Sequence, residues 1–281
     1  MKPILNIGLV NNMPDAAMEA TECQFVTLLH EAAANEFTLR LTFYSFPRFP
    51  PRNQTRRRLI RYRDISDLWN RSLDALIVTG TEPCAANLKE EPYWPDIAQL
   101  LDWAAQNTLS AIWSCLAAHA AVLHFDGISR RRLSKKQFGV FQCARVNGHF
   151  LHAGVLPRFD VPHSRWNDLS ASELQAAGYE ILTRLDDGGV DAFVKHGKSL
   201  FVFLQGHPEY DADTLLLEYR RDFKRFIKGE TQSAPALPHG YKDTRGARPH
   251  SWHAEAVRLY RNWLLYIVEQ KARAVRPLYG V

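Results

Sequence analysis

The sequence contains no run of about 18 apolar residues, the length that a membrane-spanning helix needs, so we expect no membrane partner. Its first apolar segment, residues 4–10, follows Met1-Lys2-Pro3 and lacks a small-residue cleavage site, which predicts a strand rather than a signal peptide. Hydrophobic residues make up 46% and charged residues 23% of the 281 residues, which excludes a disordered or fibrous chain. This length fits about two domains or one large α/β domain.

Cysteine is scarce, and the four cysteines (Cys23, Cys84, Cys115 and Cys143) are far apart. The absence of a CxxC pair argues against zinc fingers and disulfide-rich scaffolds, and a reducing, cytoplasmic location fits best. The scattered histidines also lack the spacing of metal ligands. We therefore expect neither a metal nor a bound cofactor.

The net charge of +5 is mild, but positive charge is concentrated in one place, because seven arginines lie between Arg48 and Arg63. We interpret this segment as a solvated surface loop. Attraction of a polyanionic ligand, such as the phosphates of coenzyme A, is the alternative. No nucleic-acid partner is expected, because no recognised nucleic-acid motif accompanies the arginines.

Short apolar runs alternate with helical patterns along the first half of the chain. The expected strands are residues 4–10, 37–46, 75–78 and 109–113, and the expected helices begin at Pro14-Asp15 and cover residues 95–106 and 116–125. This alternation predicts a doubly wound, mainly parallel sheet with right-handed crossovers.

The second half is less regular. The expected strands are residues 138–146, 179–185, 190–196 and 200–204, and the expected helices are residues 171–177, 211–228 and 254–270, with a long loop at 231–249. No linker separates the halves, so we predict a single α/β domain over residues 1–281.

Three polar clusters follow strands of the predicted sheet: Thr79-Gly80-Thr81-Glu82-Pro83, Trp113-Ser114-Cys115-Leu116-Ala117 and Gly206-His207-Pro208-Glu209-Tyr210. Open α/β sheets bind ligands at the carboxyl ends of their strands. We therefore expect these clusters to meet at one edge of the sheet.

Cys115 lies where a strand turns into a helix, as the nucleophile does in a nucleophile elbow. The start of the helix favours the thiolate, which is the reactive form. The N–H of Leu116 and a donor from the Gly80-Thr81 turn are expected to form an oxyanion hole. The alternative is a buried cysteine without a chemical role.

His207 and Glu209 are two residues apart at the end of a late strand. A histidine can act as a base while a carboxylate orients it, so Cys115, His207 and Glu209 fit a nucleophile–base–orienter triad. A chance His-Pro-Glu sequence on a loop is the alternative.

The order of a strand, a cysteine at a sharp turn and a late His-Pro-Glu motif resembles class I glutamine amidotransferase-like folds. The G-x-C-x-G motif of those enzymes is absent here, and further motifs look like the homoserine O-acyltransferase (homoserine O-succinyltransferase) family instead. These motifs are Asn11-Asn12-Met13-Pro14 with Glu19 and Gln24-Phe25, Thr79-Gly80 with Tyr93-Trp94-Pro95, Pro162-His163-Ser164-Arg165, Gly206-His207-Pro208-Glu209-Tyr210-Asp211-Ala212 with Glu218 and Arg221-Asp222, and Asn262-Trp263-Leu264. The similarity covers about residues 4–270.

This resemblance implies a flavodoxin-like three-layer fold and a ping-pong acyl transfer in methionine biosynthesis. Cys115 would carry the acyl group from acyl-CoA, His207 would move the proton, and Glu209 would orient the imidazole. Acyl-CoA would be a co-substrate and the hydroxyl of L-homoserine the acceptor. The family also suggests a homodimer, formed through the aromatic C-terminal helix.

The resemblance further implies four substrate-binding residues. Arg221 would pair with the homoserine carboxylate, Glu218 would lie towards the ammonium group, and Arg165 and Lys136 would lie near the substrate. Glu218 and Arg221 are three residues apart and share a helix face, so an ordinary surface ion pair is the alternative. For Lys136 the alternative is a solvated basic turn.

The loop after Gly80 departs from the T-G-A-P pattern that the family usually has. In the family, a residue just beyond the proline looks like the selector of the acyl donor, and counting without gaps places Cys84 there. A small neutral side chain would accept succinyl, which we favour over acetyl, while Glu82 could block the pocket if the loop shifts.

Two other activities stay open on the sequence alone. One is a glutamine amidotransferase-like hydrolase, and the other is O-acyl transfer to serine or another hydroxy amino acid. A binding module without catalysis is the third alternative, although the presence of Cys115, His207 and Glu209 together argues against it.

Overall fold

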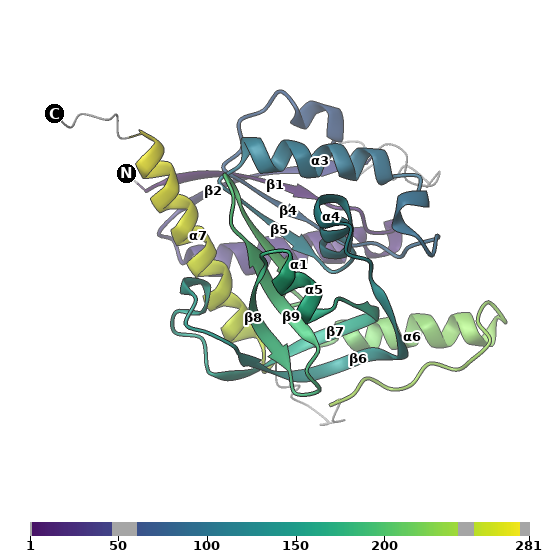
Figure 1. Ribbon diagram of the computed structural model, residues 1–281. Helices are drawn as coiled ribbons and strands as arrows, with labels where there is room; N and C mark the ends of the chain where they lie inside the picture. The colour runs from purple at the N-terminus through teal and green to yellow at the C-terminus, as the bar shows by residue number, and fades with distance from the viewer. Residues whose placement is uncertain (1, 47–60, 241–249, 276–281) are drawn as a thin grey trace.

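One ten-stranded sheet runs through the computed structural model, which describes residues 2–46, 61–240 and 250–275 (Figure 1). Its strand order is β3-β2-β1-β4-β5-β10-β9-β8-β6-β7. The six parallel strands are β1 Ile4–Val10, β2 Thr38–Ser45, β3 Tyr62–Asp64, β4 Ala75–Val78, β5 Ser110–Ser114 and β10 Leu200–Leu204. The antiparallel strands are β6 Arg131–Arg145, β7 Arg158–Asp168, β8 Glu180–Leu185 and β9 Val190–Lys195.

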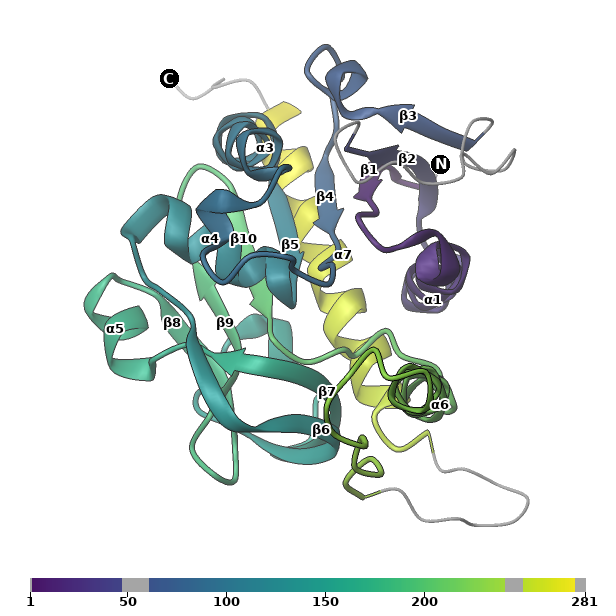
Figure 2. The ribbon, with the colours of Figure 1, turned by 90° about the vertical axis from the view of Figure 1, so that its right-hand side faces the viewer.

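Helices cover both faces of this sheet (Figure 2). On one face lie α3 Trp94–Asn107, α4 Leu116–Asp126 and α5 Ala171–Ala176, and on the other α1 Asp15–Ala33 and α7 His253–Val275. α6 Thr214–Ile227 lies beside β6 and β7. Short 3-10 helices are η1 Ile65–Leu68, η2 Leu88–Glu90 and η3 Phe150–His152. The result is a three-layer α/β/α arrangement.

The parallel half of the sheet agrees with the sequence analysis, because each expected strand exists and its ends differ by at most one residue. Short apolar runs identify such strands well, since both of their faces are buried. The four residues of β4 and the five of β10 are all buried. β3, which has only three residues, was not predicted.

The antiparallel half corrects the sequence analysis at two strands. β6 begins at Arg131, seven residues before the expected start, because its basic first part is exposed and carries no apolar alternation. This part pairs with the end of β7 across an irregularity between Arg132 and Gln137. β7 itself was missed, since it contains Pro162 and many polar residues, both of which are tolerated in a strand at the sheet edge.

α7 is longer than expected and packs against its own sheet. Tyr260 and Trp263 are 0% and 1% exposed, and Trp263 Nε1 donates to Ser110 Oγ at 2.8 Å. The aromatic face that we expected to form a dimer interface is therefore buried within the chain. No helix in the described ranges is both long and apolar enough to cross a bilayer.

Two predicted segments lie wholly or partly outside the described residues. Of the arginine-rich segment, Arg61 and Arg63 are described, and Arg61 Nε lies 2.7 Å from Glu22 Oε1. Of the loop expected at residues 231–249, residues 231–240 are described. His239 joins this loop to β6, where its O accepts from the N–H of Val140 at 2.9 Å.

Candidate active site

Three polar segments meet at the carboxyl ends of neighbouring parallel strands. β4, β5 and β10 are adjacent, and they lead into Thr79-Gly80-Thr81, Cys115 and His207 respectively. A cavity of about 1220 Å³ opens at this edge, and residues of all three segments line it. The expectation that the three clusters share one edge of the sheet is confirmed.

Cys115 occupies a strained turn between β5 and α4. Its backbone has φ 51° and ψ −111°, in a region that residues other than glycine rarely adopt. The N–H of Cys115 donates to Leu204 O at 2.7 Å, and its carbonyl accepts from the N–H of Ala118 at 3.0 Å. Such strain costs about 1–3 kcal/mol and persists only where the surroundings impose it, which is typical of catalytic turns.

Gly80 lies directly against this turn. A Cβ atom there would stand 3.1 Å from Leu116 N and 3.3 Å from Cys115 Cβ, so the approach suits a residue without a side chain. Leu116 begins α4, where the first N–H groups have no acceptor within the helix. The predicted oxyanion donors are thus brought together beside Cys115.

His207 is a buried imidazole between a carboxylate and a thiol. Its Nδ1 lies 2.8 Å from Glu209 Oε1, and its ring stacks on that of Tyr210 with the centroids 4.3 Å apart. Burial opposes the charged form, but the Glu209 carboxylate and the hydrogen-bonded Cys115 raise the pKa of His207 well above its ordinary value. This imidazole is therefore disposed to hold a proton beside the cysteine.

Glu218 connects α6 to Tyr210, the residue that stacks on His207. Its Oε1 accepts from the Tyr210 hydroxyl at 2.5 Å, and its Oε2 accepts from Ser164 Oγ at 2.5 Å. The sequence analysis named Ser164 only as part of a motif, and it gave no contact for Tyr210. Their roles depend on pairing between distant segments, and single-sequence patterns do not reveal such pairing.

Arg221 and Lys136 converge on Asp222. Arg221 Nη2 lies 2.8 Å from Asp222 Oδ1, and Lys136 Nζ donates to Asp222 Oδ2 at 3.2 Å. Although partial burial opposes ionisation, the two cations lower the pKa of Asp222. Lys136 lies in β6 rather than in a turn, and both basic side chains line the cavity.

Arg165 lines the cavity, but most of its side chain is buried. It is 4% exposed, and its Nη1 donates to Asp168 Oδ1 at 2.7 Å and to Gln205 Oε1 at 3.2 Å. Gln205 Oε1 also lies 2.7 Å from His119 Nε2. This network connects β7 and β10 with α4 beneath the cavity.

The two residues considered for donor selection are both exposed, on the loop after β4. Glu82 forms a two-pronged ion pair with Arg225 of α6, at 3.0 Å and 3.1 Å. Cys84 lines the same cavity and is a free thiol.

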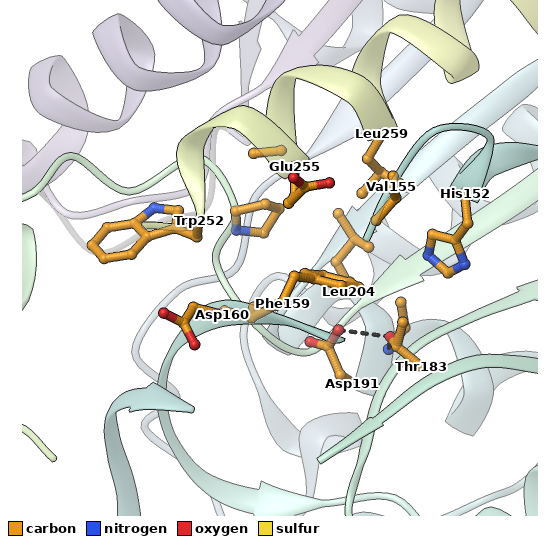
Figure 3. Close-up of a pocket in the computed structure, with 14 residues that line it drawn as sticks. His152, Val155, Phe159, Asp160, Thr183, Asp191, Leu204, Trp252, Glu255 and Leu259 are labelled. Atoms are coloured by element: carbon orange, nitrogen blue, oxygen red, sulfur yellow. Dashed lines mark hydrogen bonds between the residues drawn. The ribbon is translucent and has the colours of Figure 1, made fainter. Parts of the chain in front are cut away.

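A buried acid–base pair supports the strand end that carries His207. His163 Nε2 lies 3.3 Å from Asp191 Oδ1, and Asp191 Oδ2 accepts from Thr183 Oγ1 at 2.7 Å. A second, small cavity of about 20 Å³ borders Asp191 and Thr183, and Figure 3 shows the two side chains joined there. That volume holds about one water molecule.

The fold also brings Cys143 to this pair. The possible ligand atoms of Cys143, His163 and Asp191 lie within 4.8 Å of one another, although these residues have no metal-ligand spacing in the sequence. A second group, His149, Glu180 and His196, is equally close at the surface. Asp191 already has two protein partners, His163 and Thr183.

Residues 2–274 match the sequence model of the family described as homoserine O-succinyltransferase. The chain belongs to this family. A homoserine O-succinyltransferase from Rhodopseudomonas palustris is 52% identical over 241 residues, which cover 85% of this chain and 72% of that protein. A homoserine O-succinyltransferase from Methylorubrum extorquens is 41% identical over 301 residues, covering 96% of this chain and 89% of the relative. The family resemblance inferred from the motifs is confirmed.

Solved structures of glutamine amidotransferases share the fold of this homoserine O-succinyltransferase family member. One from Thermotoga maritima has a TM-score of 0.57 at 13% identity and covers 94% of this chain and 98% of its own. One from Methylobacillus flagellatus has a TM-score of 0.57 at 14% identity and covers 95% of both chains. At these identities the likeness concerns the fold alone, and it confirms the expected class I glutamine amidotransferase-like architecture.

Proposed function

We propose that this protein transfers the succinyl group of succinyl-CoA to the hydroxyl of L-homoserine, a step of methionine biosynthesis, through a thioester on Cys115. The observation that carries the proposal is the strained cysteine turn beside the His207–Glu209 pair, in a chain of the homoserine O-succinyltransferase family.

In the first half-reaction, Cys115 gives its proton to His207 and the thiolate attacks the carbonyl carbon of the donor thioester. Electron density moves onto the carbonyl oxygen, which accepts hydrogen bonds from the N–H groups at Leu116 and the Gly80-Thr81 turn. When the carbonyl re-forms, the bond to the CoA sulfur breaks. His207 returns its proton to the departing thiolate, so free CoA leaves and the succinyl group remains on Cys115.

In the second half-reaction, the homoserine hydroxyl gives its proton to His207 and the oxygen attacks the Cys115 thioester. The new C–O bond forms, the C–S bond breaks, and the proton of His207 restores the thiol. Glu209 keeps the imidazole oriented in both steps and stabilises its cation. The buried setting of His207 helps the bound hydroxyl to compete with water.

Homoserine carries a carboxylate and an ammonium group, and the α6 side of the cavity offers opposite charges for both. Arg221 is proposed to bind the carboxylate with Lys136 nearby, and Glu218 is proposed to face the ammonium group. Arg165 is proposed to support the site through Gln205 instead of touching the substrate.

Initial rates with both substrates varied test this proposal. We expect parallel double-reciprocal lines, release of CoA and formation of O-succinylhomoserine, with serine a poorer acceptor. Release of ammonia from glutamine without acyl transfer would overturn the proposal and favour the hydrolase alternative. A higher kcat/KM with acetyl-CoA than with succinyl-CoA would overturn the choice of donor.

A further inference from the structure

We propose that Arg130 binds the terminal carboxylate of the succinyl group and thereby makes the site selective for a dicarboxylic acyl donor. The inference rests on the proposed function, since it concerns the acyl end of the donor when that donor lies against Cys115. It adds a specificity residue to which the sequence analysis gave no role.

The chemistry of the donor sets the requirement. A succinyl group differs from an acetyl group by a methylene and a carboxylate, and a carboxylate that leaves water needs a cation or strong hydrogen-bond donors. The carboxylate is joined to the reacting carbonyl by two methylenes, so its partner has to line the same cavity as Cys115.

Most cations that line this cavity already have a carboxylate partner. Lys136 and Arg221 pair with Asp222 and are already assigned to the homoserine carboxylate, while Arg165 pairs with Asp168 and Arg225 pairs with Glu82. Arg132 and Lys135 are exposed, and the Arg132 guanidinium lies over the Trp166 ring at 4.6 Å. Arg130 is a half-buried cation of this cavity that has no ion pair within the described ranges.

The Arg130 guanidinium is held in place from one side. Its Nη2 donates to Ala85 O at 3.1 Å and to Ala86 O at 3.0 Å. Its Nη1 is buried and has no hydrogen-bond partner among the described residues. A buried N–H donor of a charged group without an acceptor is costly, so its presence in the cavity that also holds Cys115 points to a ligand acceptor.

The loop after β4, whose Ala85 and Ala86 carbonyls accept from Arg130, is held by a further hydrogen bond. Glu91 is 3% exposed, and its Oε1 accepts from the N–H of Ala85 at 2.6 Å. The same loop carries Thr81, whose Oγ1 is also buried without a partner in the described part of the chain. Arg130 and Thr81 therefore each bring an unused donor to the lining of the cavity that holds Cys115, and a carboxylate has two oxygens to accept from them.

The electrostatic setting of Arg130 agrees with this geometry. Burial and the neighbouring Arg132 lower the pKa of Arg130, and the Glu91 carboxylate acts in the opposite direction. Arg130 and Cys115 line the same cavity. A carboxylate bound at Arg130 would offset the cost of burying the guanidinium charge.

Donor selectivity tests the inference. We compare kcat/KM for succinyl-CoA and for acetyl-CoA in the wild type, in Arg130→Gln and in the matched control Arg131→Gln, which removes a neighbouring exposed charge that pairs with Glu173 and does not line the cavity. For Arg130→Gln we expect kcat/KM with succinyl-CoA to fall about 10- to 100-fold and that with acetyl-CoA to change less than about threefold. The control should keep the wild-type ratio.

Equal losses with both donors would overturn the inference, because they would show that Arg130 only holds the loop. An unchanged rate with succinyl-CoA would overturn it as well. Arg130→Lys covers the case in which the glutamine variant fails to fold. It removes the two-pronged donor, so in a folded lysine variant kcat/KM with succinyl-CoA should fall more than kcat/KM with acetyl-CoA. An equal loss of both donors in the lysine variant would again contradict the inference.

The proposed function fails separately. If the wild type transfers no acyl group from either donor, the enzyme assignment is wrong whatever Arg130 does. If the wild type transfers succinyl and only the selectivity of Arg130→Gln is unaltered, the enzyme assignment stands and the role of Arg130 falls.

Discussion

At the scale of single residues, the site depends on side chains held in unfavourable states. Cys115 has a positive φ, His207 is a buried imidazole with a raised pKa, and Glu209 Oε2 is buried without a partner in the described part of the chain. The positive φ, the burial of the imidazole and the unpartnered oxygen each cost folding free energy, and the Glu209 carboxylate offsets the cost at His207. Together the three residues place a proton acceptor beside a thiol, which is the arrangement that the proposed acyl transfer needs.

Glu209→Gln tests the electrostatic part of this arrangement. Removing the carboxylate should bring the pKa of His207 down towards its ordinary value, because Glu209 is the main group that raises it. The turnover number should fall by about 10²- to 10⁴-fold, as the imidazolium loses its partner. NMR titration of the histidine ring measures the shift, and Glu90→Gln, on the exposed η2 helix, is the control.

Glu209→Gln should also change the folding stability, by an amount that depends on pH. A raised pKa in the folded state contributes stability that is complete below the unfolded value of about 6.5 and is lost as the pH rises through the folded value. Glu209→Gln should therefore lose more stability relative to the wild type at about pH 5.5 than at a pH above the folded value. A difference that does not vary with pH would contradict the charge pairing.

At the scale of elements, the position of His207 depends on close packing at the end of β10. A Cβ atom on Gly206 would stand 2.5 Å from Val161 Cγ1, 2.7 Å from Asp191 Oδ1 and 2.9 Å from His163 Nε2. These atoms belong to β7 and β9, so the antiparallel half of the sheet positions the strand end that carries His207.

Gly206→Ala should therefore lower the free energy of unfolding by about 1–3 kcal/mol and reduce turnover, because overpacking shifts the backbone that carries His207. Urea unfolding and initial rates measure the two effects. Gly148→Ala is the matched control, since a Cβ atom there meets nothing within 4 Å. Full activity and stability in Gly206→Ala would show that this packing is unimportant.

The elements also show what a sequence can and cannot predict. β10 and β4 are short apolar runs that end in polar motifs, and both were located from that pattern. β7 was not, because Pro162 and its polar neighbours hide the strand, and its pairing with β6 is a contact between distant segments. Apolar periodicity reports burial, so strands that are exposed along part of their length escape it.

At the scale of the whole molecule, the meeting of Cys115, His207 and Glu209 was predictable from the sequence and the contacts around them were not. Cys115 and His207 follow strands that the parallel sheet sets side by side, so topology alone brings them together. The contacts of Glu218 with Ser164 and of Lys136 with Asp222 join α6 to β7 and β6. These contacts join residues far apart in the sequence, so a local sequence pattern cannot predict them.

The buried network beneath the cavity predicts a pH dependence of global stability. Burial lowers the pKa of His119 to about 4, so this ring stays neutral in the fold while the unfolded chain takes up a proton near its ordinary pKa of about 6.5. Stability should therefore fall as the pH drops from about 6.5 to about 4. His119 accounts for about 2 kcal/mol of that loss between about pH 7 and about pH 5.

Urea unfolding of the wild type and of His119→Gln at those two pH values measures this contribution. The variant should lose less stability on acidification than the wild type. His196→Gln, at an exposed site, should follow the wild type. Identical acid sensitivity of wild type and His119→Gln would mean that His119 is not held neutral in the fold.

The account rests on Cys115 carrying the acyl group between the two substrates, and intact mass spectrometry tests this most directly. After incubation with succinyl-CoA alone, the protein should gain the mass of one succinyl group, which peptide mapping places on Cys115 and which L-homoserine removes. Cys115→Ala should gain none, while Cys84→Ala, which changes another cysteine of the cavity, should behave as the wild type. A stoichiometric adduct on any other residue, or full turnover by Cys115→Ala, would contradict the account.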